Sequence, residues 1–156
     1  MPSIGLAIGV QAPDFQLPDH RGGKVRLQDL REQRAVLLVF FPFAFTEVCS
    51  SEFRALQSKV KAFEHRGVTV LGISCDSPYA LAEFATREQL TLDLLSDFWP
   101  HGAVCREYGV LLDDKGFAMR GSFLVNRKGN IVWSLLNGPA DERDPREYEN
   151  AIARLG

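Results

Sequence analysis

The chemistry that this sequence could perform centres on Cys49. An apolar run, Ala35 to Phe41, ends at Pro42, and a helical pattern begins close to the cysteine. A thiol at the start of a helix lies in the positive field of the helix N-terminus, which favours the reactive thiolate. Thr46, three residues earlier, offers a hydroxyl that can donate and accept hydrogen bonds near the sulfur. The spacing indicates an activated thiol where a buried strand meets a helix.

The elements that must position this thiol predict an α/β fold. Strand-like patterns cover residues 14–17, 24–27, 35–41, 68–74, 92–95, 121–126 and 131–136. Helical patterns cover residues 46–65, 78–88, 100–108 and 145–155. An irregular lead-in is expected over residues 1–13 and a polar connector over 28–33. This order predicts one thioredoxin-like domain over residues 1–156, with a mixed central sheet and helices on both faces.

Composition and charge exclude several classes of protein. The chain has 156 residues, of which 46% are hydrophobic and 24% are charged, as in ordinary globular proteins. A formal net charge of -2 offers no basic surface for nucleic acid or an anionic membrane. The longest apolar stretch is too short for a membrane helix and Pro42 interrupts it, and the N-terminus lacks the features of a signal peptide. Three cysteines without paired spacing indicate reduced thiols and a cytoplasmic location.

The pattern Pro42-x-x-x-Thr46-x-x-Cys49 resembles the active-site motif of the peroxiredoxins, and it has the strand before it and the helix after it that the motif requires. Further segments extend the resemblance over most of the chain. They are Ala12-Pro13-Asp14-Phe15, Leu95 to Val104 with Tyr108-Gly109-Val110, and Arg120 to Val125. The second of these resembles the alkyl hydroperoxide reductase E subgroup of that family.

The resemblance implies a site made of Cys49, Thr46, Arg120 and Pro42. Cys49 would attack a hydroperoxide and become a sulfenic acid, which an external thiol would then reduce. Arg120, Thr46 and the Cys49 backbone N–H would stabilise the charge that moves to the leaving oxygen, and Pro42 would limit access of water. The mechanism implied needs no metal, flavin or haem. Arg120 owes this role to the resemblance alone.

The other two cysteines leave the catalytic cycle open. Position +5 after Cys49 is Arg54, and no cysteine follows Cys105, so two common sites of a resolving cysteine are empty. Cys75 follows a strand expected to neighbour residues 35–41, so it is either a resolving cysteine at the same end of the sheet or a small filler. Cys105 is either a resolving cysteine or a partly buried thiol.

Two acidic residues flank the reactive cysteine, and each has an expected orientation. Glu52 is expected to balance the helix macrodipole in the first turn rather than to touch substrate. Glu47 is expected to point outward, because a carboxylate near the sulfur would oppose formation of the thiolate.

The sequence also indicates an oligomeric state and leaves alternative functions open. Phe98-Trp99-Pro100 corresponds to a region that borders a dimer interface in peroxiredoxins, so a homodimer is expected. A monothiol disulfide reductase of thioredoxin fold is a weaker alternative, since Cys49-Ser50-Ser51-Glu52 lacks the second cysteine of a CxxC motif. A peroxide sensor or redox relay would need the same thiolate, so it stays open.

Overall fold

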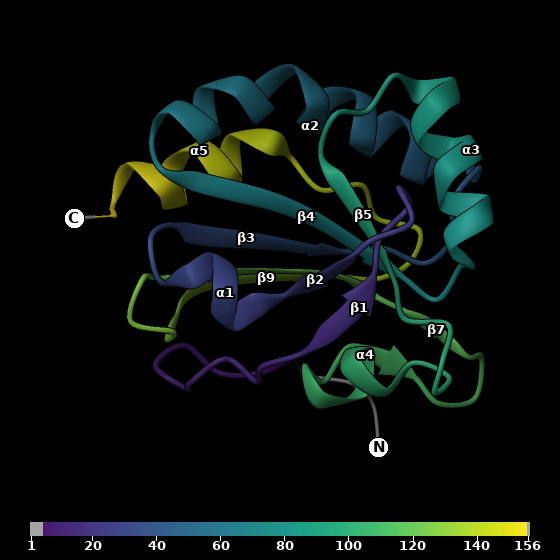
Figure 1. Cartoon of the computed structure of the whole chain (residues 1–156), viewed down its shortest axis with the longest axis horizontal. Helices are drawn as coiled ribbons and strands as arrows, with labels where there is room; N and C mark the ends of the chain where they lie inside the picture. The colour runs from purple at the N-terminus through teal and green to yellow at the C-terminus, as the bar shows by residue number, and fades with distance from the viewer. Residues whose placement is uncertain (1–4, 156) are drawn as a thin grey trace.

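The computed structural model describes residues 5–155, and a five-stranded sheet with the order β5-β4-β3-β8-β9 runs through its centre (Figure 1). Its strands are β3 (Ala35–Phe40), β4 (Val68–Ser74), β5 (Asp93–Ser96), β8 (Arg120–Val125) and β9 (Ile131–Asn137). Strands β3, β4 and β5 are parallel, β8 is antiparallel to β3, and β9 is antiparallel to β8. The predicted mixed sheet is confirmed.

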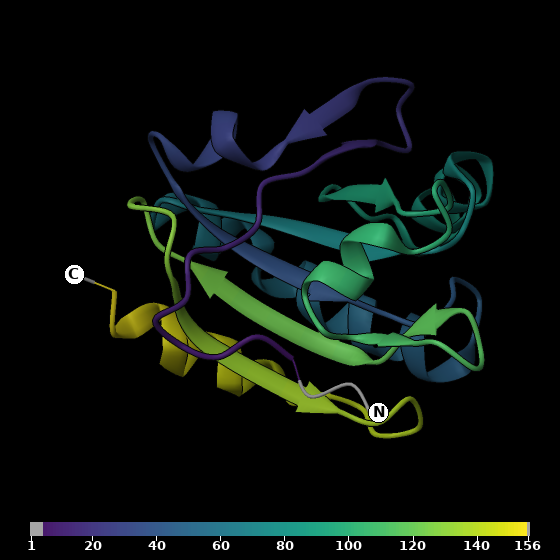
Figure 2. The same cartoon turned by 90° about the horizontal axis from the view of Figure 1, so that it is seen from below.

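Helices cover both faces of this sheet, as Figures 1 and 2 show. One face carries α2 (Glu47–His65), α3 (Pro78–Glu88) and α5 (Pro145–Ala153). The other carries α1 (Leu27–Arg31), α4 (Ala103–Glu107) and a hairpin of β1 (Gln16–Pro18) and β2 (Lys24–Arg26). A second small hairpin joins β6 (Leu111–Leu112) to β7 (Phe117–Ala118).

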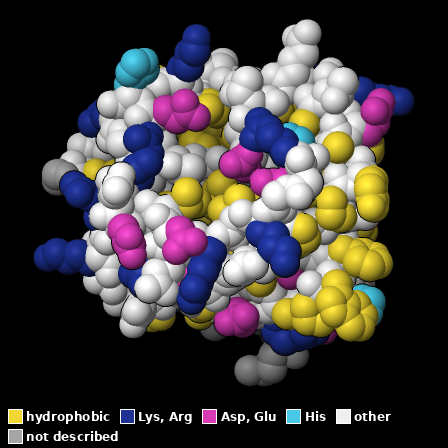
Figure 3. Space-filling model, viewed as in Figure 1, with side chains coloured by type: hydrophobic (Ala, Val, Ile, Leu, Met, Phe, Trp, Pro, Cys, Tyr) yellow, Lys and Arg dark blue, Asp and Glu magenta, His cyan; other side chains and the backbone are white. Residues whose placement is uncertain are grey.

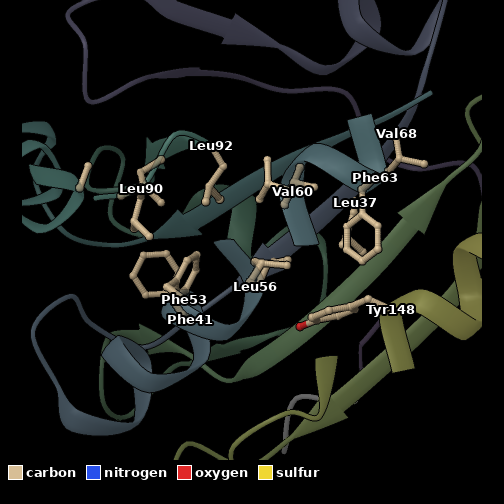
Figure 4. Close-up of a cluster of buried hydrophobic side chains, with 14 of the residues drawn as sticks. Leu37, Phe41, Phe53, Leu56, Val60, Phe63, Val68, Leu90, Leu92 and Tyr148 are labelled. Atoms are coloured by element: carbon tan, nitrogen blue, oxygen red, sulfur yellow. The ribbon is translucent and has the colours of Figure 1, made fainter. Parts of the chain in front are cut away.

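Strand β3 is apolar throughout because both of its faces are buried. Leu37 and Val39 point to the cluster under α2, whereas Val36 and Leu38 belong to the cluster on the opposite face. Figure 4 shows the first cluster, in which side chains of α2 pack over the sheet. Burial of each such side chain contributes roughly 1.5–3 kcal/mol, so these contacts fix α2 firmly against the sheet.

The predicted helix starts are confirmed by their caps. The Thr46 side chain accepts a hydrogen bond from the Cys49 backbone N–H, and Ser77 accepts one from the Ala80 N–H. At the other end of α2, Gly67 adopts φ 80°, a left-handed conformation that glycine takes without strain.

Two local predictions were wrong or incomplete, and one pair of strands was missed. Residues 28–33 are not a connector throughout, because Leu27–Arg31 form α1 around the buried Leu27. The helix expected over 100–108 is only Ala103–Glu107, since Gly102 adopts φ 80° and separates it from the preceding turn. The β6-β7 hairpin was not predicted. Elements this short carry little local signal, because tertiary contacts rather than intrinsic propensity stabilise them.

The N-terminal lead-in is irregular over residues 5–13, apart from one bridge between Gln11 and Asn130. The first four residues of that prediction lie outside the described part of the chain. Among residues 5–155, no helix has the length and apolar character that a membrane crossing needs.

Candidate active site

Cys49 lies beyond the C-terminal ends of the parallel strands, in the first turn of the helix that follows β3. It is the third residue of α2, and its side chain is fully buried. The Thr46 hydroxyl oxygen accepts a hydrogen bond from the Cys49 N–H at 3.2 Å and donates to the Phe43 carbonyl at 3.4 Å. Pro42 is buried in the connection between β3 and α2. Glu47 is exposed, as expected.

Arg120 reaches the sulfur from a distant part of the sequence. It is the first residue of β8. Because β8 runs antiparallel to β3, the N-terminal end of β8 lies beside the C-terminal end of β3. Its Nη1 donates to the Cys49 Sγ at 3.1 Å, and its Nε donates to the Pro139 carbonyl at 2.7 Å. The Arg120 side chain is only 2% exposed. A buried guanidinium group is therefore held against the thiol.

A second buried arginine, Arg143, completes the site. Glu52, one helical turn after Cys49, accepts from the Arg143 N–H at 2.7 Å, Nε at 2.9 Å and Nη2 at 2.9 Å. Glu52 Oε1 also accepts from Arg120 Nη1 at 2.7 Å. The sequence predicted that Glu52 balances the macrodipole, but the structure places it between two buried guanidinium groups. Nothing in the local sequence distinguished Arg143 from other arginines.

The family of this chain follows from comparison with known proteins. The profile of the AhpC/TSA family matches residues 8–134. Alkyl hydroperoxide reductase E of Mycobacterium tuberculosis is 42% identical over 150 residues, which cover 96% of this chain and 98% of the relative. The chain belongs to the AhpC/TSA family of peroxiredoxins. Peroxiredoxin Bcp of Escherichia coli is 39% identical over 133 residues, or 81% of this chain and 83% of that protein.

Solved structures agree with this assignment. The crystal structure of peroxidoxin BcpB from Mycobacterium tuberculosis matches with a TM-score of 0.81 and 28% identity over 95% of each chain. The reduced 2-Cys peroxiredoxin of Plasmodium vivax matches with a TM-score of 0.84 and 30% identity, covering 95% of this chain and 81% of the other. The fold of this peroxiredoxin is therefore the thioredoxin-like fold that the sequence predicted.

The charged side chains around Cys49 in the peroxiredoxin site carry a net positive charge. Burial raises the pKa of Glu52, but hydrogen bonds and charge from Arg143, with the charge of Arg120, bring that pKa below its ordinary value. Burial lowers the pKa of Arg143, yet interactions with Tyr148, Glu52 and Cys49 hold it above its ordinary value. Two guanidinium groups and one carboxylate leave one positive charge unmatched, and a Cys49 thiolate would match it.

Arg143 is itself fixed by neighbours on two elements. Its Nη1 donates to the Gly121 carbonyl and to the Ser122 hydroxyl, both at 3.0 Å. The Ser122 hydroxyl is hydrogen-bonded in turn to the Tyr148 hydroxyl of α5 at 2.9 Å. These bonds order the guanidinium without help from substrate, as expected of a preorganised site.

The loop that leads to Cys49 is anchored to the neighbouring strand. The Asp76 carboxylate, just past β4, accepts from the Ala44 N–H at 2.8 Å and from the Ser74 hydroxyl at 2.7 Å. Burial nevertheless raises the pKa of Asp76. Phe45, with φ 73°, packs on Phe84 of α3. The connection between β3 and α2 is therefore held from both sides.

Neither of the other cysteines is brought to Cys49. The Cys49 side chain belongs to the cluster under α2, whereas Cys75 and Cys105 belong to the cluster on the opposite face of the sheet. Strand β4 does neighbour β3, as the sequence predicted. The side chain of Cys75, however, packs on the other side of the sheet.

Proposed function

We propose that this peroxiredoxin is a thiol-dependent peroxidase that reduces hydrogen peroxide and organic hydroperoxides through Cys49. The observation that carries the proposal is the 3.1 Å contact between the Arg120 guanidinium and the Cys49 sulfur at a helix N-terminus. Buried positive charge there favours the thiolate, which is the nucleophile in thiol chemistry.

The reaction moves negative charge from sulfur to oxygen. The Cys49 thiolate attacks one oxygen of the hydroperoxide, an S–O bond forms, and the O–O bond breaks. The leaving oxygen takes a proton and departs as water or an alcohol, and Cys49 becomes a sulfenic acid. In the proposed mechanism Arg120 donates along this line, where it binds the transition state better than the ground state. The Cys49 N–H and the Thr46 hydroxyl donate here to the Thr46 oxygen and the Phe43 carbonyl, so they would join Arg120 by exchanging these partners for the substrate. Pro42 shields the sulfur from water.

Rapid mixing of the reduced protein with hydrogen peroxide and with an organic hydroperoxide tests the proposal. Oxidation of Cys49, followed by loss of its alkylation with iodoacetamide, should be orders of magnitude faster than oxidation of free cysteine at the same pH. A rate equal to that of free cysteine would contradict it. Consumption of one equivalent without turnover by added thiol would favour a peroxide sensor instead.

The Arg120 side chain is expected to supply transition-state stabilisation that a neutral residue cannot. Replacing Arg120 with Met should lower the second-order rate constant of Cys49 oxidation by about 10²–10³-fold, the usual effect of losing one oxyanion donor. Arg120→Lys is the matched variant: it keeps the charge, loses the Pro139 contact and should fall between Met and wild type. An unchanged rate in Arg120→Met would remove Arg120 from the proposed mechanism. Stopped-flow competition against a peroxidase of known rate provides the measurement.

An external thiol is proposed as the reductant, in two steps that release one disulfide and restore Cys49. The position of Cys75 and Cys105 on the opposite face of the sheet supports an external source over an internal one. All three cysteines are free, which supports our further proposal of a reducing cytoplasmic environment. Catalytic consumption of peroxide with added dithiothreitol, as opposed to a single turnover, tests the external reductant.

A homodimer is proposed through the exposed aromatic side chains beside the site. Figure 3 shows hydrophobic side chains gathered at the side of the molecule where α3 and the segment after β5 lie. Large exposed side chains in this part of the chain are Phe43, Phe45, Tyr79, Phe98 and Trp99. Exposed apolar patches of this kind are typical of protein interfaces.

Trp99 is expected to be an interface hot spot, since it is 68% exposed in the single chain. Trp99→Asp should raise the dimer dissociation constant at least about 30-fold, which corresponds to about 2 kcal/mol. Val132→Asp, at an exposed apolar position on β9, is the control and should leave the dimer intact. Sedimentation equilibrium measures both. A monomeric wild type, or equal effects of the two variants, would contradict the proposed interface.

A further inference from the structure

A buried group of three side chains lies on the face of the sheet opposite Cys49. The sulfur atoms of Cys75 and Cys105 and a carboxylate oxygen of Asp97 all lie within 4.8 Å of one another. Cys75 directly follows β4 and is half-buried, whereas Cys105 lies in α4 and is fully buried. The proposed peroxidase mechanism uses none of these three residues.

Asp97 holds the two cysteines in place through the backbone. Its carboxylate accepts from the Cys105 N–H at 2.7 Å and from the Val104 N–H at 3.2 Å. Its own N–H donates to the Ser74 carbonyl at 2.7 Å, next to Cys75. One residue therefore fixes the start of α4 against the end of β4 and keeps the thiols adjacent.

The two thiols have different characters. The adjacent Cys105 thiol lowers the pKa of Cys75, although burial and the charges of Asp97 and Asp76 oppose the shift. The adjacent Cys75 sulfur, together with burial, raises the pKa of Cys105 well above its ordinary value. Cys75 is therefore the more accessible of the two thiols and the one that loses its proton more readily. A redox-active dithiol needs an accessible attacking thiolate and a second thiol behind it.

We propose that Cys75 and Cys105 form a second redox site, a dithiol that closes to an intramolecular disulfide by exchange with disulfides of small thiols. The Cys75 thiolate attacks one sulfur of the small disulfide, the S–S bond breaks, and one small thiolate leaves. Cys105 then loses its proton, attacks the Cys75 sulfur and displaces the second small thiolate. The two protein thiols are oxidised, and the small disulfide is reduced to two thiols.

The supply of small disulfides to this second site rests on the proposed function. Each peroxidase cycle that uses two external thiols releases their disulfide, so the second site would respond to the product of turnover at Cys49. Because the sheet separates the two sites, the dithiol does not resolve the Cys49 sulfenic acid. It responds to the thiol–disulfide balance around the protein.

A metal site is the competing reading of the same three residues. Both carboxylate oxygens of Asp97 already accept backbone N–H groups, from Val104 and Cys105. Three ligands, two of them with raised pKa values, make an incomplete site for zinc, which takes four. The geometry favours the dithiol.

The test uses the Cys49→Ser protein, so that no peroxidase chemistry contributes. The protein is equilibrated without oxygen in buffers of defined glutathione and glutathione disulfide, the free thiols are alkylated, and the protein is weighed intact and after digestion. Cys75 and Cys105 should lose alkylation together, with a mass loss of one pair of hydrogens. The ratio of disulfide to dithiol should rise about tenfold for each tenfold rise in the ratio of glutathione disulfide to the square of glutathione, as for any two-electron exchange.

Single replacements on this background separate the two roles. Cys105→Ala should trap one glutathione on Cys75, because the thiol that displaces it is gone, and Cys75→Ala should take up none. Circular dichroism confirms that each variant is folded, and Cys105→Ser provides a second form of the first variant. The two proposals fail separately, because peroxide kinetics of the wild type are measured without glutathione.

Three results would overturn the second redox site. One is full alkylation of both thiols in the most oxidising buffer, with the protein folded. Another is a stable glutathione adduct on Cys75 while Cys105 is intact. The third is a stoichiometric zinc ion that protects both thiols until a chelator removes it, which would make the group a metal site.

Discussion

Replacing Cys49 with serine is expected to abolish hydroperoxide reduction. A serine hydroxyl is not ionised at neutral pH and forms no sulfenic acid, so neither half of the cycle can proceed. The buried Arg120 and Glu52 pair stays in place, and the hydroxyl is close in size to the thiol, so the fold should be kept. Peroxide consumption with dithiothreitol as reductant should fall to the rate of buffer without protein.

The other cysteines are matched controls for this variant. Cys75→Ser and Cys105→Ala remove thiols on the opposite face of the sheet and should keep the wild-type rate of Cys49 oxidation. Loss of activity in Cys75→Ser with a folded protein would show that the peroxidatic thiol is elsewhere. Residual turnover in Cys49→Ser would lead to the same conclusion.

Replacing Glu52 with glutamine is expected to lower the free energy of unfolding at neutral pH by about 3–5 kcal/mol, the usual cost of removing one partner from a buried ion pair. The side chains of Glu52, Arg120 and Arg143 are at most 5% exposed, so water does not screen the two guanidinium groups left behind. Urea unfolding followed by circular dichroism measures the change. Glu83→Gln removes the exposed ion pair with Arg87 and should cost no more than about 1 kcal/mol.

The contribution of Glu52 to the free energy of unfolding should decrease as the pH falls. The folded state holds the pKa of Glu52 below its ordinary value of 4.5, so the native protein binds this proton more weakly than the unfolded chain does. The stabilisation is therefore complete above pH 4.5 and is lost as the pH falls through the depressed pKa. The stability difference between wild type and Glu52→Gln should shrink on acidification. A difference that stays constant down to acid unfolding would contradict the proposed charge balance.

The elements nearest the reactive cysteine could be predicted because their signals are local. Residues 68–74 and 78–88 have the same bounds as β4 and α3, since an apolar run ends at polar residues and Ser77-Pro78 opens a helix. Thr46 and Cys49 were found in the same way, from a cap position and a helix start. Arg120 has no such signal, and only the resemblance to peroxiredoxins pointed to it.

The part of the site that the sequence did not reveal depends on contacts between distant segments. Arg143 and Glu52 are 91 residues apart in the sequence, and no pattern in the residues around either one predicts that they pair. The dithiol of Cys75 and Cys105 likewise depends on how α4 lies against the end of β4. Periodicity and capping rules describe single helices and strands, so they do not predict contacts between side chains that come together only in the folded chain.

Arg120 and Arg143 both lie in the last quarter of the sequence, which has a consequence for the chain during its synthesis. Cys49, Thr46 and Glu52 leave the ribosome first, but Arg120 Nε finds its acceptor only at Pro139, and Glu52 finds Arg143 later still. A nascent chain that ends before residue 139 carries the cysteine without the cations fixed around it. Its thiol should behave as an ordinary cysteine, and peroxide reactivity should arise only when the last quarter of the chain has folded.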